Sequence, residues 1–472
     1  MTEEANKTEK FGKEYEYAWN KYNEKELDKV FQLSKRYIDF ISKCKTEREC
    51  VKECIAQAEK QGFKDLQAIL DKGGKLKAGD KVYANNMDKA LALFVIGSDK
   101  LEKGMRILGA HIDSPRLDLK QNPLYEDTEL AMLETHYYGG IKKYQWVTIP
   151  LSIHGVVVKK SGERVDVVIG EDDSDPVIGI SDLLIHLSAD QLQKKLSEGI
   201  EGENLNILVG SMPIEDKKAK NRVKQNILKL LNEKYGIIEE DFVSAELEVV
   251  PAGRARDYGF DRSMVMGYGH DDRICAYTSF EALLEVKNPD KTCVALLVDK
   301  EEIGSVGATG MHSKFFENTV AEIMNLAETF NELKLRRCLA NSKMLSSDVT
   351  AAFDPNYPSV MEKKNSAYFG KGIVFCKYTG AKGKSGSNDA NAEYIAEIRA
   401  IMDKHNVTWQ TAELGKVDQG GGGTIAYILA QYGMRVIDCG IALQNMHAPY
   451  EVASKADIYE TMRGYHAFLL DA

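Results

Sequence analysis

Short apolar runs that alternate with amphipathic helical patterns constrain the fold of this 472-residue chain more than any other feature. Strand-like runs occupy residues 91–96, 105–110, 292–298 and 435–441. Alternation of strands with helices favours a mostly parallel sheet covered by helices on both faces. We therefore predict an α/β fold with a mixed, mostly parallel sheet flanked by helices.

A β-rich stretch interrupts this alternation between about residues 116 and 257. Runs at 147–158 and 165–169 read as strands on either side of the turn-like Ser161-Gly162-Glu163. A helical pattern with scattered charges resumes at 187–235. We interpret residues 116–257 as an inserted β-rich domain, so that the α/β domain comprises residues 1–115 and 258–472.

Two predicted helices lie at the ends of the chain. Near the N-terminus, apolar side chains recur on one face at helical spacing: Val30, Leu33, Tyr37, Phe40 and Ile41. The last helix is expected to begin near Ser454, where Asp457 would complete a capping box.

The composition excludes several classes of protein. The chain carries 62 basic and 72 acidic residues, and an acidic chain is a poor partner for nucleic acid or an anionic membrane surface. No apolar run approaches the roughly 18 residues that span a bilayer. The first 30 residues lack the apolar core of a signal peptide, and eight cysteines in so long a chain do not form a disulfide framework. We expect reduced thiols in a cytoplasmic protein.

Polar groups with ligand chemistry follow the predicted strands, where ligands bind in open α/β sheets. A fifth such group precedes the helix that carries Tyr277. The five groups are His111-Ile112-Asp113, Asp299-Lys300-Glu301-Glu302, Ser346-Ser347-Asp348, Gln444-Asn445-Met446-His447 and His270-Asp271-Asp272-Arg273. Their shared location is more informative than any single residue.

Nitrogen and carboxylate ligands without thiolate suit zinc, cobalt or manganese. Two histidines and several carboxylates could hold two ions about 3.5–4 Å apart with a carboxylate between them. Asp113, two positions after His111, could orient its imidazole. Of the adjacent Glu301 and Glu302, one could bind metal while the other takes a proton from water.

Each of these groups also has an ordinary structural interpretation. A single His-x-Asp is most often a polar pair in a loop, Glu301-Glu302 could form a solvated turn, and Asp348 could cap a helix. The run Gly420–Gly423 lacks the Lys-Ser or Lys-Thr of a phosphate loop. It could let backbone approach a substrate closely, or it could be a flexible loop.

Five motifs in this order resemble the M18 family of metallo-aminopeptidases, which includes aspartyl aminopeptidases and the aminopeptidase I of yeast vacuoles. They are GAHIDSPR (109–116), HDDR (270–273), DKEEIGS (299–305), SDVTAA (347–352) and MHAPYE (446–451). The resemblance covers nearly the whole chain. It implies a dinuclear exopeptidase that removes N-terminal residues from peptides with metal-activated water, zinc being the expected metal and cobalt or manganese the alternatives.

The resemblance also implies a role for each matching residue. His111 and Asp348 would bind one metal ion, Glu302 and His447 the other, and Asp271 would bridge the two. Asp113 would orient His111, and Glu301 would be the general base.

The family's insert is a dimerisation domain, and its members commonly assemble as tetrahedral dodecamers. A histidine from a neighbour's insert completes the site in some members. His186 is our candidate for it, although an exposed helix histidine is nearly as plausible.

Two departures from the family pattern leave alternatives open. Many members have Asp-Asn where this chain has Asp271-Asp272, so Asp272 could be the bridging residue instead. The segment 371–388 differs from that of aspartyl aminopeptidases, and its Lys377 could either pair with an acidic side chain of the substrate or be an ordinary surface lysine. Carboxypeptidase or deacylase activity, or a non-catalytic assembly protein, remain the rival functions.

Overall fold

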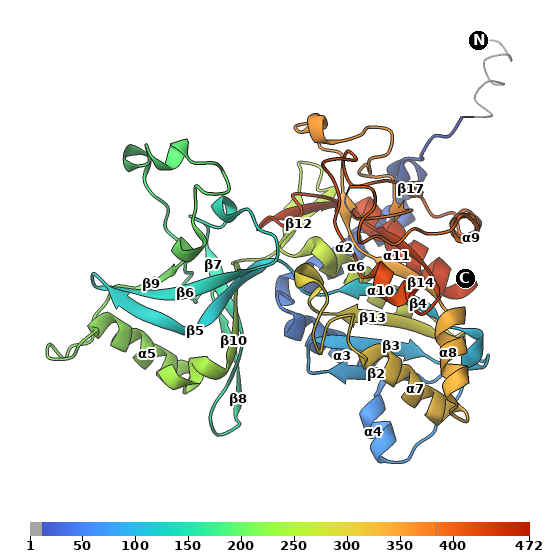
Figure 1. The fold of residues 1–472 in the computed structure, drawn as a ribbon, viewed down its shortest axis with the longest axis horizontal. Coiled ribbons are helices and arrows are strands. Elements are labelled where there is room, and N and C mark those ends of the chain that lie inside the picture. Colours follow the sequence, from blue (N-terminus) through green and yellow to red (C-terminus); the bar gives the residue numbers. More distant parts are fainter. Residues whose placement is uncertain (1–11, 381) are drawn as a thin grey trace, which may run out of the picture.

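The computed structural model of the protein describes residues 12–380 and 382–472. Residues 1–11 of the predicted first segment of the α/β domain lie outside the described residues. Figure 1 shows two lobes, an α/β body on the right and a smaller β-rich lobe on the left. No helix in the described ranges is long and apolar enough to cross a membrane.

The body is built on a nine-stranded sheet in the order β1-β2-β3-β13-β4-β14-β18-β16-β17. Its four central strands β13, β4, β14 and β18 run parallel, whereas β3 and β16 pair antiparallel to their outer edges. In sheet order, the bounds are Lys64–Asp65, Lys81–Asn86, Ala90–Val95, Cys293–Val298, Arg106–His111, Lys343–Ser347, Arg435–Gly440, Ile373–Cys376 and Trp409–Thr411. The predicted mixed, mostly parallel sheet is confirmed, and the four expected strand runs coincide with β3, β4, β13 and β18.

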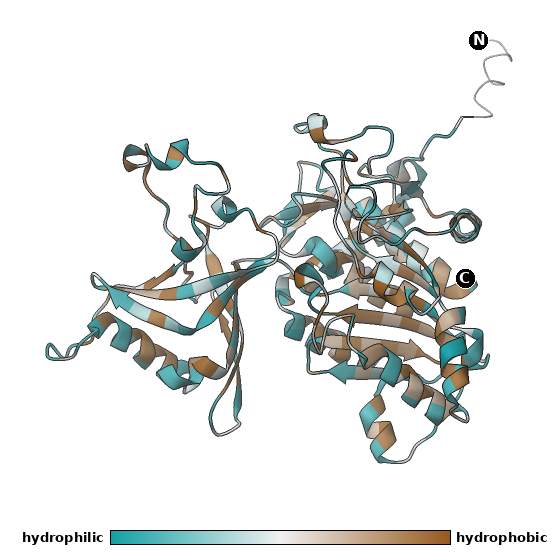
Figure 2. Ribbon diagram, in the orientation of Figure 1, coloured by the Kyte–Doolittle hydropathy of each residue, from teal (hydrophilic) through white to brown (hydrophobic). Residues whose placement is uncertain are grey.

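Helices cover both faces of this sheet. One face packs against α2 (Glu24–Lys43), α3 (Glu47–Lys60), α6 (His270–Leu284), α9 (Ala392–Lys404) and α11 (Lys455–Asp471). The other packs against α4 (Leu66–Asp71), α7 (Phe315–Ala327), α8 (Glu332–Asn341) and α10 (Ala426–Ala430). In Figure 2 the central strands are hydrophobic, as expected for strands that are buried on both faces.

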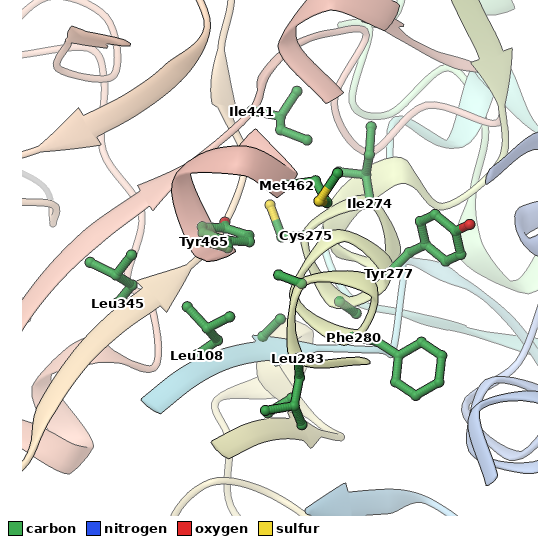
Figure 3. Close-up of a cluster of buried hydrophobic side chains, with 14 of the residues drawn as sticks. Leu108, Ile274, Cys275, Tyr277, Phe280, Leu283, Leu345, Ile441, Met462 and Tyr465 are labelled. Atoms are coloured by element: carbon green, nitrogen blue, oxygen red, sulfur yellow. The ribbon is translucent and has the colours of Figure 1, made fainter. Parts of the chain in front are cut away.

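Helix α6 lies in the middle of the first core. In Figure 3, Cys275 of α6 lies beside Met462 and Tyr465 of α11, with Leu108 and Leu345 of the sheet on the same side, while Tyr277 and Phe280 lie on the opposite side of α6. All of these side chains are nearly inaccessible to solvent. This packing fixes the start of α6, and with it Asp271, relative to the carboxyl ends of β4 and β14.

The β-rich lobe contains an antiparallel sheet in the order β8-β7-β10-β5-β6-β9 with its own apolar core. In that order, the bounds are Arg164–Ile169, Leu151–Val158, Ala245–Pro251, Arg116–Asp127, Leu130–Tyr138 and Ile207–Gly210. Helix α5 (Arg222–Tyr235) packs against this sheet. A third, small sheet in the body has the order β11-β12-β20-β19-β15, with bounds Arg256–Tyr258, Met264–Gly267, Glu451–Ser454, Ala442–Gln444 and Thr350–Ala351.

Short 3-10 helices complete the list of described elements. They are η2 (Ala18–Lys21), η3 (Leu101–Lys103), η4 (Lys143–Gln145), η5 (Ile185–Leu187), η6 (Gln191–Gln193), η7 (Gly202–Asn204), η8 (Glu239–Ser244), η9 (Glu301–Ile303) and η10 (Pro358–Val360).

Two local predictions are wrong. The helical pattern expected over 187–235 forms an α-helix only in α5, and glycines at 199, 202 and 210 interrupt the preceding segment, which holds only the short helices η6 and η7. The last helix begins after Ser454 as expected, but no capping box forms there. The carboxylate of Asp457 instead accepts hydrogen bonds from the backbone N–H groups of Gly370 and Gly372.

A cluster of buried charges joins the two lobes, and we call Lys45, Glu49, His154 and Glu171 the junction cluster. The Lys45 ammonium lies 2.5 Å from Glu171 and donates to the carbonyls of Pro251 and Gly253. His154 bridges Glu49 and Glu171 at 2.8 and 3.1 Å. Each charged group therefore has a partner of opposite charge.

Candidate metal centre and active site

Seven of the predicted site residues meet at one edge of the body sheet. His111 ends β4 and Asp113 follows it, while the η9 turn after β13 carries Glu301 and Glu302. Asp348 follows β14, Asp271 lies at the start of α6, and His447 lies in the loop between β19 and β20. We call these seven residues the active-edge cluster. They gather because parallel central strands present their carboxyl ends at the same edge.

The cluster contains two overlapping groups with the geometry of metal ligands. His111, Asp271 and Asp348 offer ligand atoms within 4.8 Å of one another, and so do Asp271, Glu302 and His447. A further group, His111 with Glu301 and Glu302, meets the same criterion. The first two groups coincide with the two ligand sets implied by the family resemblance.

Asp271 is shared by both groups, and its two oxygens point in different directions. Oδ1 lies 3.2 Å from His111 Nε2, and Oδ2 lies 3.2 Å from His447 Nε2. The adjacent Asp272 is fully buried and belongs to none of the three ligand groups. The geometry thus favours Asp271 over Asp272 as a bridge between two ions.

Asp113 holds several members of the cluster in position. His111 Nδ1 is hydrogen-bonded to the backbone carbonyl of Asp113 at 3.0 Å and lies 3.3 Å from its Oδ1, so the other imidazole nitrogen, Nε2, faces Asp271. Its carboxylate also accepts hydrogen bonds from the backbone N–H groups of Glu301 and Glu302, each at 3.1 Å. Tyr138, from β6 of the insert, donates to Asp113 Oδ2 at 2.8 Å. The carboxylate therefore links the imidazole of His111 to the η9 turn.

Glu451 is a site residue that our reasoning from the sequence missed. It is buried, and its two oxygens accept hydrogen bonds from the backbone N–H groups of Asp271 and His447 at 3.0 and 2.8 Å. His447 has a φ of +64°, a conformation that is uncommon for residues other than glycine. Glu451 ends the MHAPYE motif, so its position was visible in the sequence, but its partners were not.

Burial and mutual repulsion perturb the titration of the cluster. Burial, together with the charges of Asp113 and Asp271, raises the pKa of Glu301 to about 7. Burial and neighbouring carboxylates likewise raise the pKa values of Glu302 and Asp348 well above their usual range. Burial opposes protonation of His447, but its hydrogen bond to Asp271 and the charge of Glu302 outweigh burial and raise its pKa to about 10.

The donor set fits bound cations. Buried oxygens of Asp271 and Glu302 have no hydrogen-bond partner within the described chain. The cluster combines two imidazoles with five carboxylates, an excess of negative charge that is costly to bury without cations. Imidazole and carboxylate ligands without thiolate suit zinc, cobalt and manganese.

A cavity of about 660 Å³ opens onto the cluster. Asp271, Glu301, Glu302, Asp348 and His447 line one side of it. The run Gly420–Gly423, which we considered as a place where backbone could approach a substrate, lines another part of the wall. The cavity is large enough for the first residues of a peptide.

Two predicted substrate-binding residues lie elsewhere in the chain. His186 is an exposed residue of η5, in the long loop between β8 and β9 of the β-rich lobe. The structure does not bring it to the cavity of its own chain. Lys377 follows β16, and its half-exposed side chain lies 4.0 Å from Asp389, outside the residues that line the cavity.

Comparisons with known proteins agree on one family. The model of the family described as aminopeptidase I zinc metalloprotease (M18) matches residues 40–469. The probable M18 family aminopeptidase 1 of Clostridium acetobutylicum is 72% identical over 457 residues, which are 97% of this chain and 98% of that protein.

Solved structures share the fold. The crystal structure of aminopeptidase I from Clostridium acetobutylicum has a TM-score of 0.91 at 68% identity and covers 97% of this chain and 100% of its own. The M18 aminopeptidase of Thermotoga maritima has a TM-score of 0.93 at 45% identity, with 98% and 100% covered. The S. cerevisiae mApe1 dodecamer, at 23% identity, has a TM-score of 0.75 over 93% of this chain and 96% of its own.

Proposed function

The chain belongs to the M18 family of aminopeptidase I zinc metalloproteases, and from this membership we propose that it is a metal-dependent aminopeptidase that removes single residues from the N-termini of peptides. The observation that carries the proposal is the position of Asp271. Its two oxygens face His111 and His447, and each histidine brings a further carboxylate to its side of the cluster.

Two divalent ions per subunit fit this arrangement, with zinc as the first candidate and cobalt or manganese as alternatives. His111 and Asp348 would hold one ion and Glu302 and His447 the other, with Asp271 shared. When bound, such ions supply a Lewis acid for the scissile carbonyl, a positive anchor for the substrate and water that ionises near neutral pH.

Glu301 is the proposed general base. Its carboxylate lines the cavity and lies 3.9 Å from His111 Nε2, beside the residues that would hold the ions and the attacking water. It would take a proton from the attacking water and pass it to the nitrogen of the leaving amine. Asp113 is a positioning residue here, because it fixes the imidazole of His111 and receives the N–H group of Glu301.

The test that separates an aminopeptidase from its rivals uses blocked peptides. Metal-free protein is reconstituted with zinc, cobalt or manganese and given a peptide with a free amino terminus, with an acetylated amino terminus, or with an amidated carboxyl terminus. An aminopeptidase cleaves the first and third and spares the second. Cleavage that needs a free carboxyl terminus would indicate a carboxypeptidase, and release of acetate would indicate a deacylase. Turnover of none of them would leave a non-catalytic assembly protein.

We propose that the insert, residues 116–257, is a dimerisation domain and that dimers assemble into a tetrahedral dodecamer. The loop between β8 and β9, which contains η5 and η6, supports an interface. It exposes several large apolar side chains: Leu183, Leu184, Ile185, Leu187, Leu192 and Leu196. The structural relative mApe1 was solved as a dodecamer.

His186 lies in this loop between β8 and β9 and would reach the cavity of a neighbouring subunit. His186→Ala should then lower turnover without changing the number of metal ions per chain. A change in this loop that disrupts the oligomer, such as Leu187→Glu, should lower turnover to a similar extent. Size-exclusion chromatography with light scattering measures the oligomeric state of each variant before its turnover is assayed. A fully active monomer would contradict the shared site.

We place the protein in the cytoplasm. All eight of its cysteines are free and buried, a state that a reducing compartment maintains. Peptides are its proposed substrates, and its acidic net charge argues against nucleic acid as a partner.

A further inference from the structure

The cavity that opens onto the active-edge cluster contains a buried carboxylate that the proposed mechanism does not use. Asp438, in β18, lines this cavity and is only 2% exposed to solvent. Its Oδ1 accepts a hydrogen bond from Thr424, which follows the run Gly420–Gly423. Its Oδ2 has no hydrogen-bond partner within the described chain.

Strand register fixes where this carboxylate lies relative to the proposed metal ligands. Asp438 is paired with Ser346 of β14 on one side and with Cys376 of β16 on the other, so the three side chains project from the same face of the sheet. Asp348 lies two residues beyond Ser346. At about 3.3 Å per residue and 4.8 Å between strands, the backbones of Asp438 and Asp348 are about 8 Å apart.

This separation suits the side chain of the first substrate residue. In the proposed function, the α-amino group and first carbonyl of the peptide are held at the active-edge cluster. A long side chain that descends from there along Cys376, which lines the cavity, would end near Asp438. The four-carbon stem of lysine and the three-carbon stem of arginine can cover such a path and place a cation at its end.

The charges of the cavity are arranged by depth. Lys382, Lys384 and Lys416 line the cavity too, but all three are exposed at its mouth, and Lys384 is paired with Asp389 at 3.0 Å. The Asp438 carboxylate forms no ion pair within the described part of the chain, and it is far less exposed to screening by solvent.

Burial explains why Asp438 would favour a cationic ligand. Burial raises its pKa to about 7, which reflects the cost of holding a negative charge there without a cation. A structural carboxylate with this degree of burial is usually paired or fully hydrogen-bonded, as in the junction cluster. Asp438 has only the hydroxyl groups of Thr424 and Ser346 beside it and no cationic partner among the described residues.

We propose that Asp438, held by Thr424, is the specificity residue for the first side chain of the substrate and selects peptides that begin with lysine or arginine. The inference rests on the proposed aminopeptidase function and deepens it. It makes the opposite prediction from Lys377, the residue suggested by the sequence, which would favour an acidic first side chain.

The test compares four aminoacyl-anilide substrates, those of lysine, arginine, leucine and glutamate, on the zinc- or cobalt-loaded oligomer. We expect kcat/KM for the basic substrates to exceed that for glutamate by about 100-fold or more, since a buried charge pair with a hydrogen bond contributes this much discrimination. Preference for glutamate would overturn the inference and favour Lys377. Preference for leucine over lysine would also overturn it and leave Asp438 as a structural group. A protein that cleaves none of the four contradicts the proposed function itself.

A variant then assigns the preference to Asp438. Asp438→Asn keeps the shape and the partner Thr424 but removes the charge, and it should lower the ratio of kcat/KM for lysine to that for leucine by about 10- to 100-fold. Asp418→Asn, an exposed change in the neighbouring loop, is the matched control and should leave the ratio within about twofold. An unchanged ratio in Asp438→Asn would overturn the assignment. Should that variant fail to fold, the wild-type panel decides alone.

Discussion

The protein contains two clusters of buried charge that differ in how their charges are balanced. In the junction cluster, Lys45 and His154 alternate with Glu49 and Glu171, and every charged group has a partner at 2.5–3.1 Å. In the active-edge cluster, five carboxylates share two histidines, and one oxygen each of Asp271 and Glu302 has no hydrogen-bond donor among the described residues. The junction cluster is balanced by its own ion pairs, while the active-edge cluster has an excess of carboxylates that the proposed metal ions would balance.

The difference separates stability from function. In a balanced cluster, the ion pairs offset the desolvation of the buried charges. Removing one of these charges is therefore expected to lower the free energy of unfolding. An unbalanced cluster carries a cost that a bound ligand relieves, and such perturbed groups concentrate at functional sites. Changes in the active-edge cluster should therefore alter turnover and metal content, and changes in the junction cluster should alter stability.

The largest effect is expected for Glu301→Gln. The variant keeps the shape of the side chain but cannot accept the proton, so kcat should fall by about 10³-fold or more while the metal content and thermal midpoint stay unchanged. Steady-state kinetics and elemental analysis measure both. The companion variant Glu302→Gln alters a proposed ligand and should lower the metal content as well. Full activity in Glu301→Gln would refute its role as the base.

Lys45→Met should produce the opposite pattern. Removing the Lys45 ammonium breaks a buried ion pair, leaves His154 to balance both Glu49 and Glu171, and removes the donor to two carbonyls, so we expect a loss of about 3 kcal/mol in the free energy of unfolding. Urea unfolding of the metal-loaded protein measures the loss. The exposed Lys43→Met serves as control and should stay within about 0.5 kcal/mol of wild type. A stable Lys45→Met variant with impaired metal binding would break the distinction between the two clusters.

Removal of the metals should make stability depend on pH. In the ion-free state the pKa of Glu301 is raised from 4.5 to about 7, so the folded state holds its proton more tightly than the unfolded state. Its contribution is therefore present below pH 4.5 and is lost as the pH rises through 7, an effect of about 3 kcal/mol. The thermal midpoint of chelated protein should fall between pH 5 and pH 8, and the metal-loaded protein should show a smaller fall. Equal slopes would mean that the ions do not bind at this cluster.

His154→Gln should give the smallest effect. Burial opposes protonation of His154, but hydrogen bonds to Glu171 and Glu49 outweigh it and raise its pKa. The charge then stabilises the fold fully below pH 6.5, and this contribution is lost as the pH rises through the folded pKa. We expect a loss of about 1 kcal/mol at pH 6 and less at pH 9, with kcat/KM unchanged. A cost that grows with pH would contradict this account of the junction cluster.

The sequence predicted those parts of the structure that depend on local pattern. Apolar runs identified β3, β4, β13 and β18, because strands buried on both faces have few polar residues. We could also predict that the polar groups that follow the strands lie close together, because parallel strands end at one edge of the sheet. The segment before α5 was mispredicted because its scattered charges resemble a helix face, while its glycines favour turns.

Contacts between distant parts of the chain could not be read from the sequence. Glu451 reaches the N–H groups of Asp271 and His447, and Asp457 reaches two glycines rather than its own helix start. Asp438 lies within an otherwise apolar strand, where no local pattern reveals what its side chain faces. Each of these carboxylates is defined by a tertiary contact, and only the folded structure supplies it.

The most direct test of the central claim is the metal content of three purified proteins: wild type, Asp271→Asn and Asp272→Asn. Each is loaded with zinc, dialysed and measured by elemental analysis against protein concentration. We predict about two ions per chain for wild type and for Asp272→Asn, and loss of most of both ions in Asp271→Asn, since one carboxylate would serve both. Two retained ions in Asp271→Asn, or their loss in Asp272→Asn alone, would contradict the shared role of Asp271.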